Sequence, residues 1–231
     1  MNKFFSTIFC LLMLIPVRGA AQTFFDTNDP TTFFSLGVRA GINTSNKTFP
    51  SGHFTEWNRN NWGIGFQAGV LANLNFKEYL SVQPGLFLQY HTGSFSYVTE
   101  YLTASNKKDS HYEMGNTKGL YLTVPIMGEV KFNLAENIKW IVDLGPYFQI
   151  KIKENGYRNI MVLYRLTQST NYETYIQENR GFQFGFKMGT GLRFYSHYFV
   201  GFHYLAGVTG AWKHPEGGKN KSWEFSLGYD F

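Results

Sequence analysis

Apolar and polar residues alternate along most of this chain, and the alternation is strict over long stretches. From residue 34 to 43, one parity is apolar and the other is small or polar. Because successive side chains of a β-strand point to opposite faces, a period of two predicts a strand with two unlike faces. The pattern recurs in eight segments and predicts strands at residues 34–43, 62–76, 80–90, 120–132, 140–152, 182–194, 198–208 and 223–231.

The connections between these strands alternate in length. Short turns on one rim and long loops on the other are typical of outer-membrane barrels. We therefore expect the short turns and both termini on the periplasmic side, and the long loops outside the cell. The short connections are predicted at 77–79, 133–139 and 195–197, and the long ones at 44–61, 93–119, 153–181 and 209–222.

The apolar parity is too bulky to fill a narrow bore, whereas the other parity holds mainly Gly, Ser, Gln, Asn and scattered charges. A soluble eight-stranded barrel of lipocalin type, the alternative, would hold its apolar side chains inside. No apolar run after the N-terminal segment approaches the roughly 20 residues that a membrane helix needs. The sequence thus predicts an all-β fold, an eight-stranded antiparallel transmembrane up-and-down β-barrel.

Aromatic residues of the apolar parity collect at the ends of the predicted strands. Amphipathic rings favour the headgroup level of a bilayer, so two aromatic girdles are expected on a lipid-facing surface. The predicted girdle residues are Phe34, Phe76, Phe132, Trp140, Phe194, Tyr198 and Phe231 at the short-turn rim, and Trp62, Tyr90 and Trp223 towards the other rim.

Three prolines fall inside the predicted strands. Pro84 and Pro146 have the lipid-facing parity and Pro125 has the lumen parity. Proline cannot donate a hydrogen bond to the ladder, so within a sheet it is expected at an edge or a bulge. Each of the three therefore predicts a local β-bulge.

The N-terminal residues have the layout of a secretory signal peptide: Lys3, then an apolar run, then small residues before Gln22. We expect residues 1–21 to be removed and residues 22–231 to form the barrel domain. Cys10, the only cysteine, lies in the apolar run, so the mature chain would have neither a disulfide framework nor a cysteine metal site.

Composition supports strands rather than helices, because 19% of the residues are aromatic and 24 are glycine. The formal charge of +5 falls to +3 once Lys3 and Arg18 leave with the signal peptide. So small an excess, without a basic cluster, argues against nucleic acid as a partner.

Four segments resemble a known family: LYLTVPIMGEVKF (120–132), DLGPYFQI (143–150), FQFGFKMGTGLRF (182–194) and YFVGFHYLAGV (198–208). They look like the PorT-like, porin-family outer-membrane β-barrel domain of Gram-negative bacteria, and the likeness covers about Phe33 to Phe231. The resemblance implies a β-barrel fold and a location in the outer membrane. The founding PorT protein takes part in a machine that exports proteins across the outer membrane, but the likeness transfers no functional residue.

Tyr229 and Phe231 resemble the aromatic signal that the barrel assembly machinery reads. The upstream glycine usual in that signal would fall at Ser226, whereas this chain has Gly228. The resemblance implies that the assembly machinery is a partner.

Nine charged residues share the lumen parity. Five are basic and four are acidic, and charges inside a narrow bore are tolerable only when they are paired. We expect a salt-bridge network that plugs the lumen; the alternative is a narrow, gated small-solute pore. The nine residues are Arg39, Glu129, Lys131, Asp143, Lys151, Lys187, Arg193, Glu224 and Asp230.

His91 and His203 also share the lumen parity, together with serines and acids that could complete a catalytic triad. The candidate partners are Ser81, Ser226, Glu129 and Asp143. A lipid-modifying enzyme is the weakest alternative, and no catalytic, cofactor or metal site is predicted. His53, His111 and His214 lie in separate loops without metal-ligand spacing.

The loop 155–175 mixes four tyrosines with Arg158 and Arg165, residue types enriched at recognition surfaces. The favoured interpretation is that the fifth and sixth strands continue above the membrane as a hairpin packed on its own aromatics; a recognition surface is compatible with it. The expected function is a structural or envelope-assembly role of a monomeric or weakly associated barrel, not an enzyme. Its expected partners are outer-membrane lipid, the assembly machinery and envelope or secretion-complex proteins.

Overall fold

The computed structural model describes residues 24–47, 55–102, 108–164, 167–175, 181–210 and 219–231. The predicted signal peptide with Cys10 lies outside these ranges, as do His53 and His214. None of the described residues forms a helix long and apolar enough to cross a membrane. The described strands are β1 (Phe34–Lys47), β2 (Thr55–Lys77), β3 (Leu80–Leu102), β4 (Lys108–Ala135), β5 (Ile138–Tyr164), β6 (Thr167–Tyr175), β7 (Phe182–Phe194), β8 (Tyr198–Gly210) and β9 (Lys219–Asp230).

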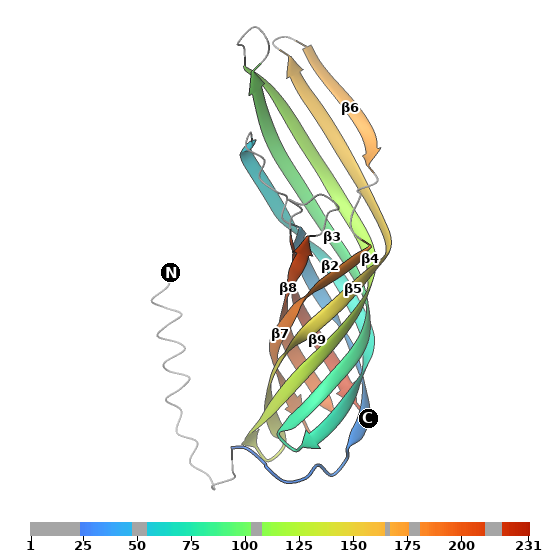
Figure 1. The fold of residues 1–231 in the computed structure, drawn as a ribbon, viewed down its shortest axis with the longest axis vertical. Coiled ribbons are helices and arrows are strands. Elements are labelled where there is room, and N and C mark those ends of the chain that lie inside the picture. Colours follow the sequence, from blue (N-terminus) through green and yellow to red (C-terminus); the bar gives the residue numbers. More distant parts are fainter. Residues whose placement is uncertain (1–23, 48–54, 103–107, 165–166, 176–180, 211–218) are drawn as a thin grey trace, which may run out of the picture.

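Eight of these strands close a barrel (Figure 1). Antiparallel neighbours follow the order β4, β3, β2, β1, β9, β8, β7, β5, and pairing of β4 with β5 completes the circle. The β1–β9 seam runs from Gly37 opposite Asp230 to Lys47 opposite Asn220. Closure gives every strand two hydrogen-bonding neighbours, which a lipid environment requires. The predicted eight-stranded antiparallel barrel is confirmed.

Several strands are longer than predicted. β2, β3, β4 and β5 contain 23, 23, 28 and 27 residues, and β6 pairs with β5 beyond the barrel, from Gly156 opposite Tyr175 to Tyr164 opposite Thr167. The segments 44–61, 93–119 and 153–181 are therefore largely strand within the described ranges, and their prediction as loops was wrong. The favoured expectation of a hairpin within 155–175 is confirmed by the pairing of β5 with β6. A strand beyond the wall faces no lipid, so it needs no continuous apolar parity.

The two ends of the barrel differ in their connections. The turn rim is formed by the tight connections 78–79, 136–137 and 195–197, and the loop rim is the opposite end. The short connections were predicted at this end. Tyr195 and Ser196 have φ angles of 51° and 62°, the left-handed conformation that tight turns use.

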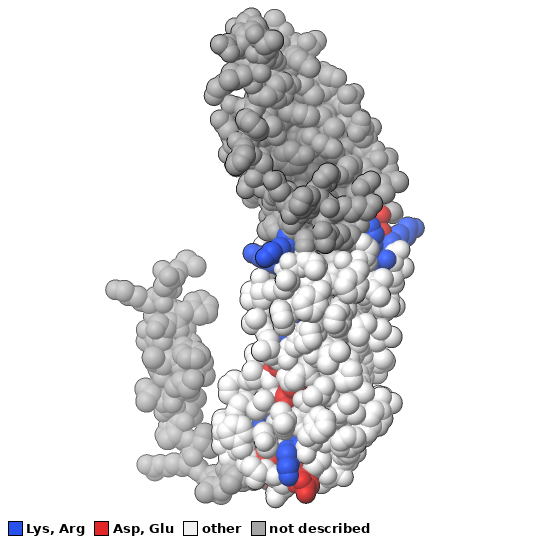
Figure 2. All heavy atoms as spheres, in the orientation of Figure 1, with Lys and Arg blue, Asp and Glu red and all other residues white. Residues whose placement is uncertain are grey.

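The outer wall between the rims is apolar, as the alternation predicted. Phe66, Val70 and Leu144 are more than half exposed although they lie in the middle of long strands. Figure 2 shows that charged side chains collect at the turn rim and at the border near the loop rim, with a mostly uncharged wall between them. Such a band is the surface that a bilayer covers.

The predicted bulges at the prolines are absent. Pairing of β2 with β3 continues without a register shift from Leu71 opposite Gly85 to Leu74 opposite Val82, past Pro84. The registers past Pro125 and Pro146 are likewise unshifted. A proline lacks one donor but inserts no residue, so the closed barrel accepts the loss of single ladder bonds. The shifts lie elsewhere, for example between Trp62 and Phe66.

Candidate functional site

The interior of the barrel is the largest assembly of polar side chains that the structure describes. Eight of the nine charged residues predicted for the lumen are buried there. The ninth, Lys151, is half-buried near the loop rim. The buried eight form two groups, a lower charge cluster near the turn rim and a central set of pairs.

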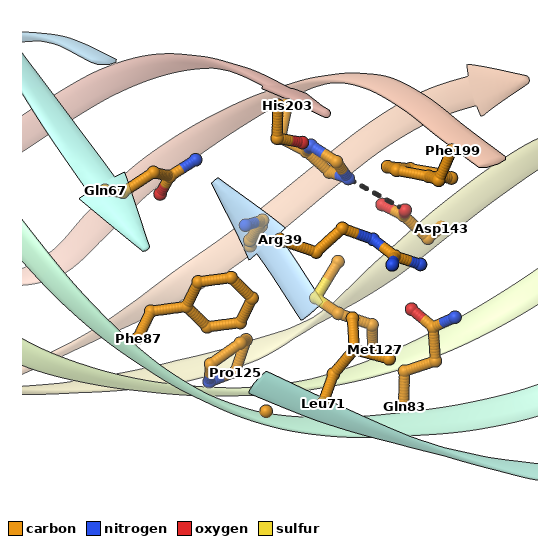
Figure 3. Close-up of a pocket in the computed structure, with 13 residues that line it drawn as sticks. Arg39, Gln67, Leu71, Gln83, Phe87, Pro125, Met127, Asp143, Phe199 and His203 are labelled. Atoms are coloured by element: carbon orange, nitrogen blue, oxygen red, sulfur yellow. Dashed lines mark hydrogen bonds and ion pairs between the residues drawn. The ribbon is translucent and has the colours of Figure 1, made fainter. Parts of the chain in front are cut away.

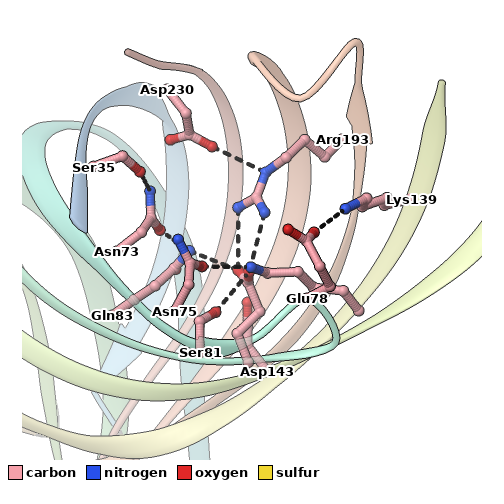
Figure 4. Close-up of polar contacts among 12 residues, drawn as sticks. Ser35, Asn73, Asn75, Glu78, Ser81, Gln83, Lys139, Asp143, Arg193 and Asp230 are labelled. Carbon is pink, nitrogen blue, oxygen red and sulfur yellow. Dashed lines mark hydrogen bonds and ion pairs between the residues drawn. The ribbon is translucent and has the colours of Figure 1, made fainter. Parts of the chain in front are cut away.

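The lower charge cluster is built around Glu129, whose carboxylate is inaccessible to solvent. Glu129 accepts hydrogen bonds from Ser81 Oγ at 3.1 Å and Gln83 Nε2 at 2.6 Å, and both terminal nitrogens of Arg193 donate to it at 3.2 and 3.4 Å (Figure 4). Four donors occupy the acceptor positions of one carboxylate, so the cost of burying its charge is offset.

Asp230 joins two arginines in the same cluster. Its carboxylate lies 2.7 Å from Arg39 Nη2 and 3.0 Å from Arg193 Nε. The Arg39 guanidinium also lies 4.4 Å from the centre of the Phe199 ring, within the range of a cation–π contact. These three charged side chains come from β9, β1 and β7, so they tie the closing seam to the rest of the barrel.

The central set contains two pairs. Lys187 Nζ lies 2.6 Å from Glu224 Oε2, and His203 Nε2 lies 2.9 Å from Asp143 Oδ2. The second pair borders a cavity of about 420 Å³, including the part open to solvent, that is lined on one side by Phe87, Pro125 and other apolar side chains (Figure 3). Within the described structure, Asp143 Oδ1 and His203 Nδ1 are buried without a hydrogen-bond partner, so water is expected in this cavity.

Amide side chains dominate the lumen towards the loop rim. Gln89 donates to Gln67 at 2.7 Å, and its Oε1 accepts from Thr123 at 2.8 Å and from Gln149 at 3.1 Å. Asn220 donates to Gln149 at 3.3 Å. This network links β2, β3, β4, β5 and β9 across the bore.

Aromatic rings packed over glycines fill the remaining space, a feature that the sequence reasoning missed. A Cβ atom on Gly191 would lie 2.7 Å from the Phe199 ring, and one on Gly85 would lie 2.7 Å from the Phe87 ring. Tyr147 covers Gly185 in the same way. The sequence does show that these rings have the lumen parity. Parity does not show which glycine lies opposite which ring.

The catalytic alternative gains no geometric support. Ser81 donates to Glu129 rather than to a histidine, and Ser226 shares a cavity with His203. No hydrogen bond of the described interior joins His203 to a serine. The described residues also contain no group of three or more His, Cys, Asp or Glu side chains suited to a metal ion.

The predicted girdle residues lie on the outer wall near both rims. Phe132 and Trp140 pack with ring centres 5.0 Å apart at the turn rim, and Trp223 packs on Phe202 at 5.1 Å towards the loop rim. Seven are exposed, namely Phe34, Trp62, Phe76, Trp140, Tyr198, Trp223 and Phe231; the half-buried ones are Tyr90, Phe132 and Phe194.

The two residues of the expected assembly signal pack together at the turn rim. The ring centres of Tyr229 and Phe231 are 5.2 Å apart. Tyr229 also stacks on His197 at 5.4 Å.

His111, which was predicted in a loop, belongs to β4, in the part that extends beyond the barrel wall.

Solved structures of outer-membrane barrels are similar in fold. Ail of Yersinia pestis, solved with the heparin analogue sucrose octasulfate, is 13% identical, with a TM-score of 0.40, over 87% of this chain and all of that one. Neisserial surface protein A is 12% identical, with a TM-score of 0.41, over 86% of this chain and 96% of that one. OprG of Pseudomonas aeruginosa is 12% identical, with a TM-score of 0.38, over 90% and 99%.

No curated protein shows significant sequence similarity to the chain. A family model does match it, under the description "Outer membrane protein beta-barrel domain", over residues 20–211. That range contains most of the barrel, from β1 to β8. The chain therefore belongs to the outer membrane protein beta-barrel domain family.

Proposed function

We infer that this protein is a sealed outer-membrane anchor that presents a projecting β-sheet to extended segments of other envelope or surface proteins. The observation that carries the proposal is the sheet itself. β4, β5 and β6 run well beyond the barrel (Figure 1). Among the described strands, β6 has a single neighbour, β5.

An edge strand offers a row of backbone donors and acceptors to another chain. Natural proteins often protect such edges with lysine or proline. The β6 sequence, TQSTNYETY, contains neither, and Glu173 is its one charged residue. A partner segment added beside β6 would gain main-chain hydrogen bonds, the binding mode known as β-augmentation.

The expected membrane orientation agrees with this role. With the turn rim in the periplasm, the projecting sheet faces the outside of the cell. A PorT-like accessory role in secretion is a narrower form of the same proposal, in which the partner is a secretion component. Delivery by the barrel assembly machinery and contact with outer-membrane lipid complete the proposed set of partners, and no enzymatic role is proposed.

Site-specific cross-linking tests the proposal. A photoreactive residue at Asn171, in β6, should give discrete protein adducts in intact envelopes of the producing bacterium. The same residue at Leu86, on the lipid-facing wall, is the control and should give none. Replacing Ser169 and Asn171 with proline should abolish adducts formed from a probe at Glu173, because proline removes edge donors. Absence of adducts at Asn171, or equal adducts at Leu86, would contradict the proposal.

A further inference from the structure

The residues that precede β1 form a strap across the turn rim. The strap, residues 24–33, is held by backbone hydrogen bonds at three points: Asn133 N donates to Phe24 O at 3.1 Å, Glu78 N to Asn28 O at 3.1 Å, and Asn75 N to Phe33 O at 2.8 Å. It thus runs from the end of β4 to the end of β2. Figure 1 shows it crossing below the barrel.

Side chains reinforce the strap at its start and in its middle. Asp29 lies 2.6 Å from Lys77 Nζ, and the Phe24 and Phe25 rings pack on Phe132 at 5.0 and 4.9 Å. The strap is therefore a fixed part of the barrel mouth.

A mouth cavity lies beside the strap. It encloses about 710 Å³, including the part open to solvent, and Pro30, Thr31 and Thr32 of the strap form one of its walls. The lining holds three basic side chains, Lys131, Lys139 and Arg193, and two acidic ones, Glu78 and Asp230.

Most of these charges have partners. Lys139 Nζ lies 2.9 Å from Glu78 Oε2, and Arg193 lies between Glu129 and Asp230. Lys131 differs from them, because its nearest carboxylate oxygen, on Glu129, is 3.6 Å away. That carboxylate already accepts hydrogen bonds from Ser81, Gln83 and Arg193.

Lys131 is therefore a buried ammonium with spare donor capacity. Its side chain is 7% exposed, and in the described structure it donates one hydrogen bond, to Asn75 Oδ1 at 2.7 Å. An ammonium group has three donors, and a buried charge that lacks partners is costly. An anion in the mouth cavity would remove this cost.

We propose that the mouth cavity is a binding site for a phosphate group, anchored by Lys131 and enclosed on one side by the strap. A phosphate supplies several acceptor oxygens and negative charge, and lysine is a common phosphate ligand. The hydroxyl groups of Thr31, Thr32 and Ser196 line the same cavity and are further donors. The phosphate comes either from solution or from a lipid headgroup at the turn rim.

Titration of the folded full barrel with inorganic phosphate tests the site. In uncharged detergent micelles, the amide resonances of Thr31, Asn75 and Lys131 should shift in a saturable manner. Lys131→Met should weaken binding about tenfold or more. Lys118→Met removes the same charge from an exposed side chain at the loop rim, and should leave the affinity unchanged. If Lys131→Met does not fold, Lys139→Met, at the same cavity, should weaken binding in the same direction.

A second arm separates the two sources of phosphate. In nanodiscs that contain phosphatidylglycerol, a lipid-headgroup site should show shifted resonances before phosphate is added, and a site for free phosphate should still titrate. The proposal would be overturned by no saturable shift with either probe. It would also be overturned if Lys118→Met weakened binding as much as Lys131→Met.

Discussion

At the scale of single residues, the interior is stable because several large side chains face small ones and most buried charges have a close partner. Phe199 packs over Gly191, where no Cβ competes for the space. Glu129 is inaccessible to solvent, yet four donors reach it. A charge that is buried without a partner is costly, and so is an overpacked interior, so both devices are needed.

The ring-over-glycine packing predicts the effect of one methyl group. In Gly191→Ala, the new Cβ would lie 2.7 Å from the Phe199 ring and 2.8 Å from a backbone oxygen, so the free energy of unfolding should fall by about 1–3 kcal/mol. Urea unfolding in lipid vesicles measures this change. Gly128→Ala is the control, since its nearest atom would be at 3.5 Å. Equal effects at both glycines would contradict the packing argument.

Removing the Glu129 carboxylate should also destabilise the barrel. Glu129→Leu leaves Arg193 and Lys131 without this carboxylate, so the free energy of unfolding should fall by about 3–5 kcal/mol. In the double variant Glu129→Leu with Arg193→Leu, part of the loss should be recovered, because one buried cation is removed with its partner. A double-mutant cycle measures the coupling, and simple additivity of the two changes would rule out the pairing.

At the scale of elements, each of the eight wall strands has, within the wall, one face for lipid and one for the lumen. The alternation of burial along β7 and β9 shows the division directly. The wall is continuous because registers are unshifted past the three prolines. The strap is held in part by ionisable side chains that solvent reaches, so its stability should depend on pH.

The lipid-facing wall predicts a depth-dependent penalty. Leu86 is exposed in the middle of the wall, and Leu134 is exposed at the turn rim. Leu86→Arg should lower the free energy of unfolding by about 2–4 kcal/mol, and Leu134→Arg by about 1 kcal/mol or less. Equilibrium unfolding in vesicles compares the two. A larger loss of unfolding free energy for Leu134→Arg than for Leu86→Arg would contradict the assignment of Leu86 to the middle of the bilayer.

The strap predicts a dependence on acidic pH. Desolvation at the rim acts to raise the pKa of Glu78, but hydrogen bonds from Lys139 and the Thr31 N–H outweigh it, so the pKa lies below 4.5. Because the folded-state pKa is lowered, this carboxylate stabilises the strap above about pH 5, and the contribution is lost as the pH falls through the lowered pKa. Hydrogen exchange of the Thr31 amide should therefore show extra opening at low pH. Glu78→Gln should remove that pH dependence, and an unchanged profile would contradict the role of Glu78.

At the scale of the whole molecule, the barrel is a closed cylinder that carries a projecting sheet, and side chains occupy much of its bore. The ion pairs of Arg39, Asp230 and Arg193 lie between the central cavity and the mouth cavity, because Arg39 lines the first and the other two line the second. Eight strands leave a bore that side chains can fill. A bore occupied by side chains is the reason why we propose a sealed anchor rather than a narrow pore.

A sealed lumen predicts electrical silence. The wild-type protein should give no discrete conductance steps in planar bilayers, since paired side chains block the bore. The double variant Arg39→Ser with Asp230→Ser removes an ion pair without changing the net charge, and it should conduct more than the wild type. Regular conductance steps from the wild type would favour the pore.

Much of the fold could be predicted from the sequence, and so could the residues that lie in the lumen. The period of two located the eight wall strands, and the span of β7, 182–194, matches its predicted range. Parity also put Arg39, Glu129 and Glu224 in the lumen. These features are predictable because the alternation is local and because lipid tolerates only one kind of outer face.

The alternation by itself determined the fold class, the lipid-facing surface and the identity of the lumen side chains. Only the tertiary structure decided which lumen charges meet, which glycine lies under which ring, how far β2 to β5 continue beyond the wall, and that residues 24–33 cross the mouth. A shift of two residues between strands preserves every parity but changes every partner. The partners are therefore set by the register and closure of the whole barrel, which no single strand encodes.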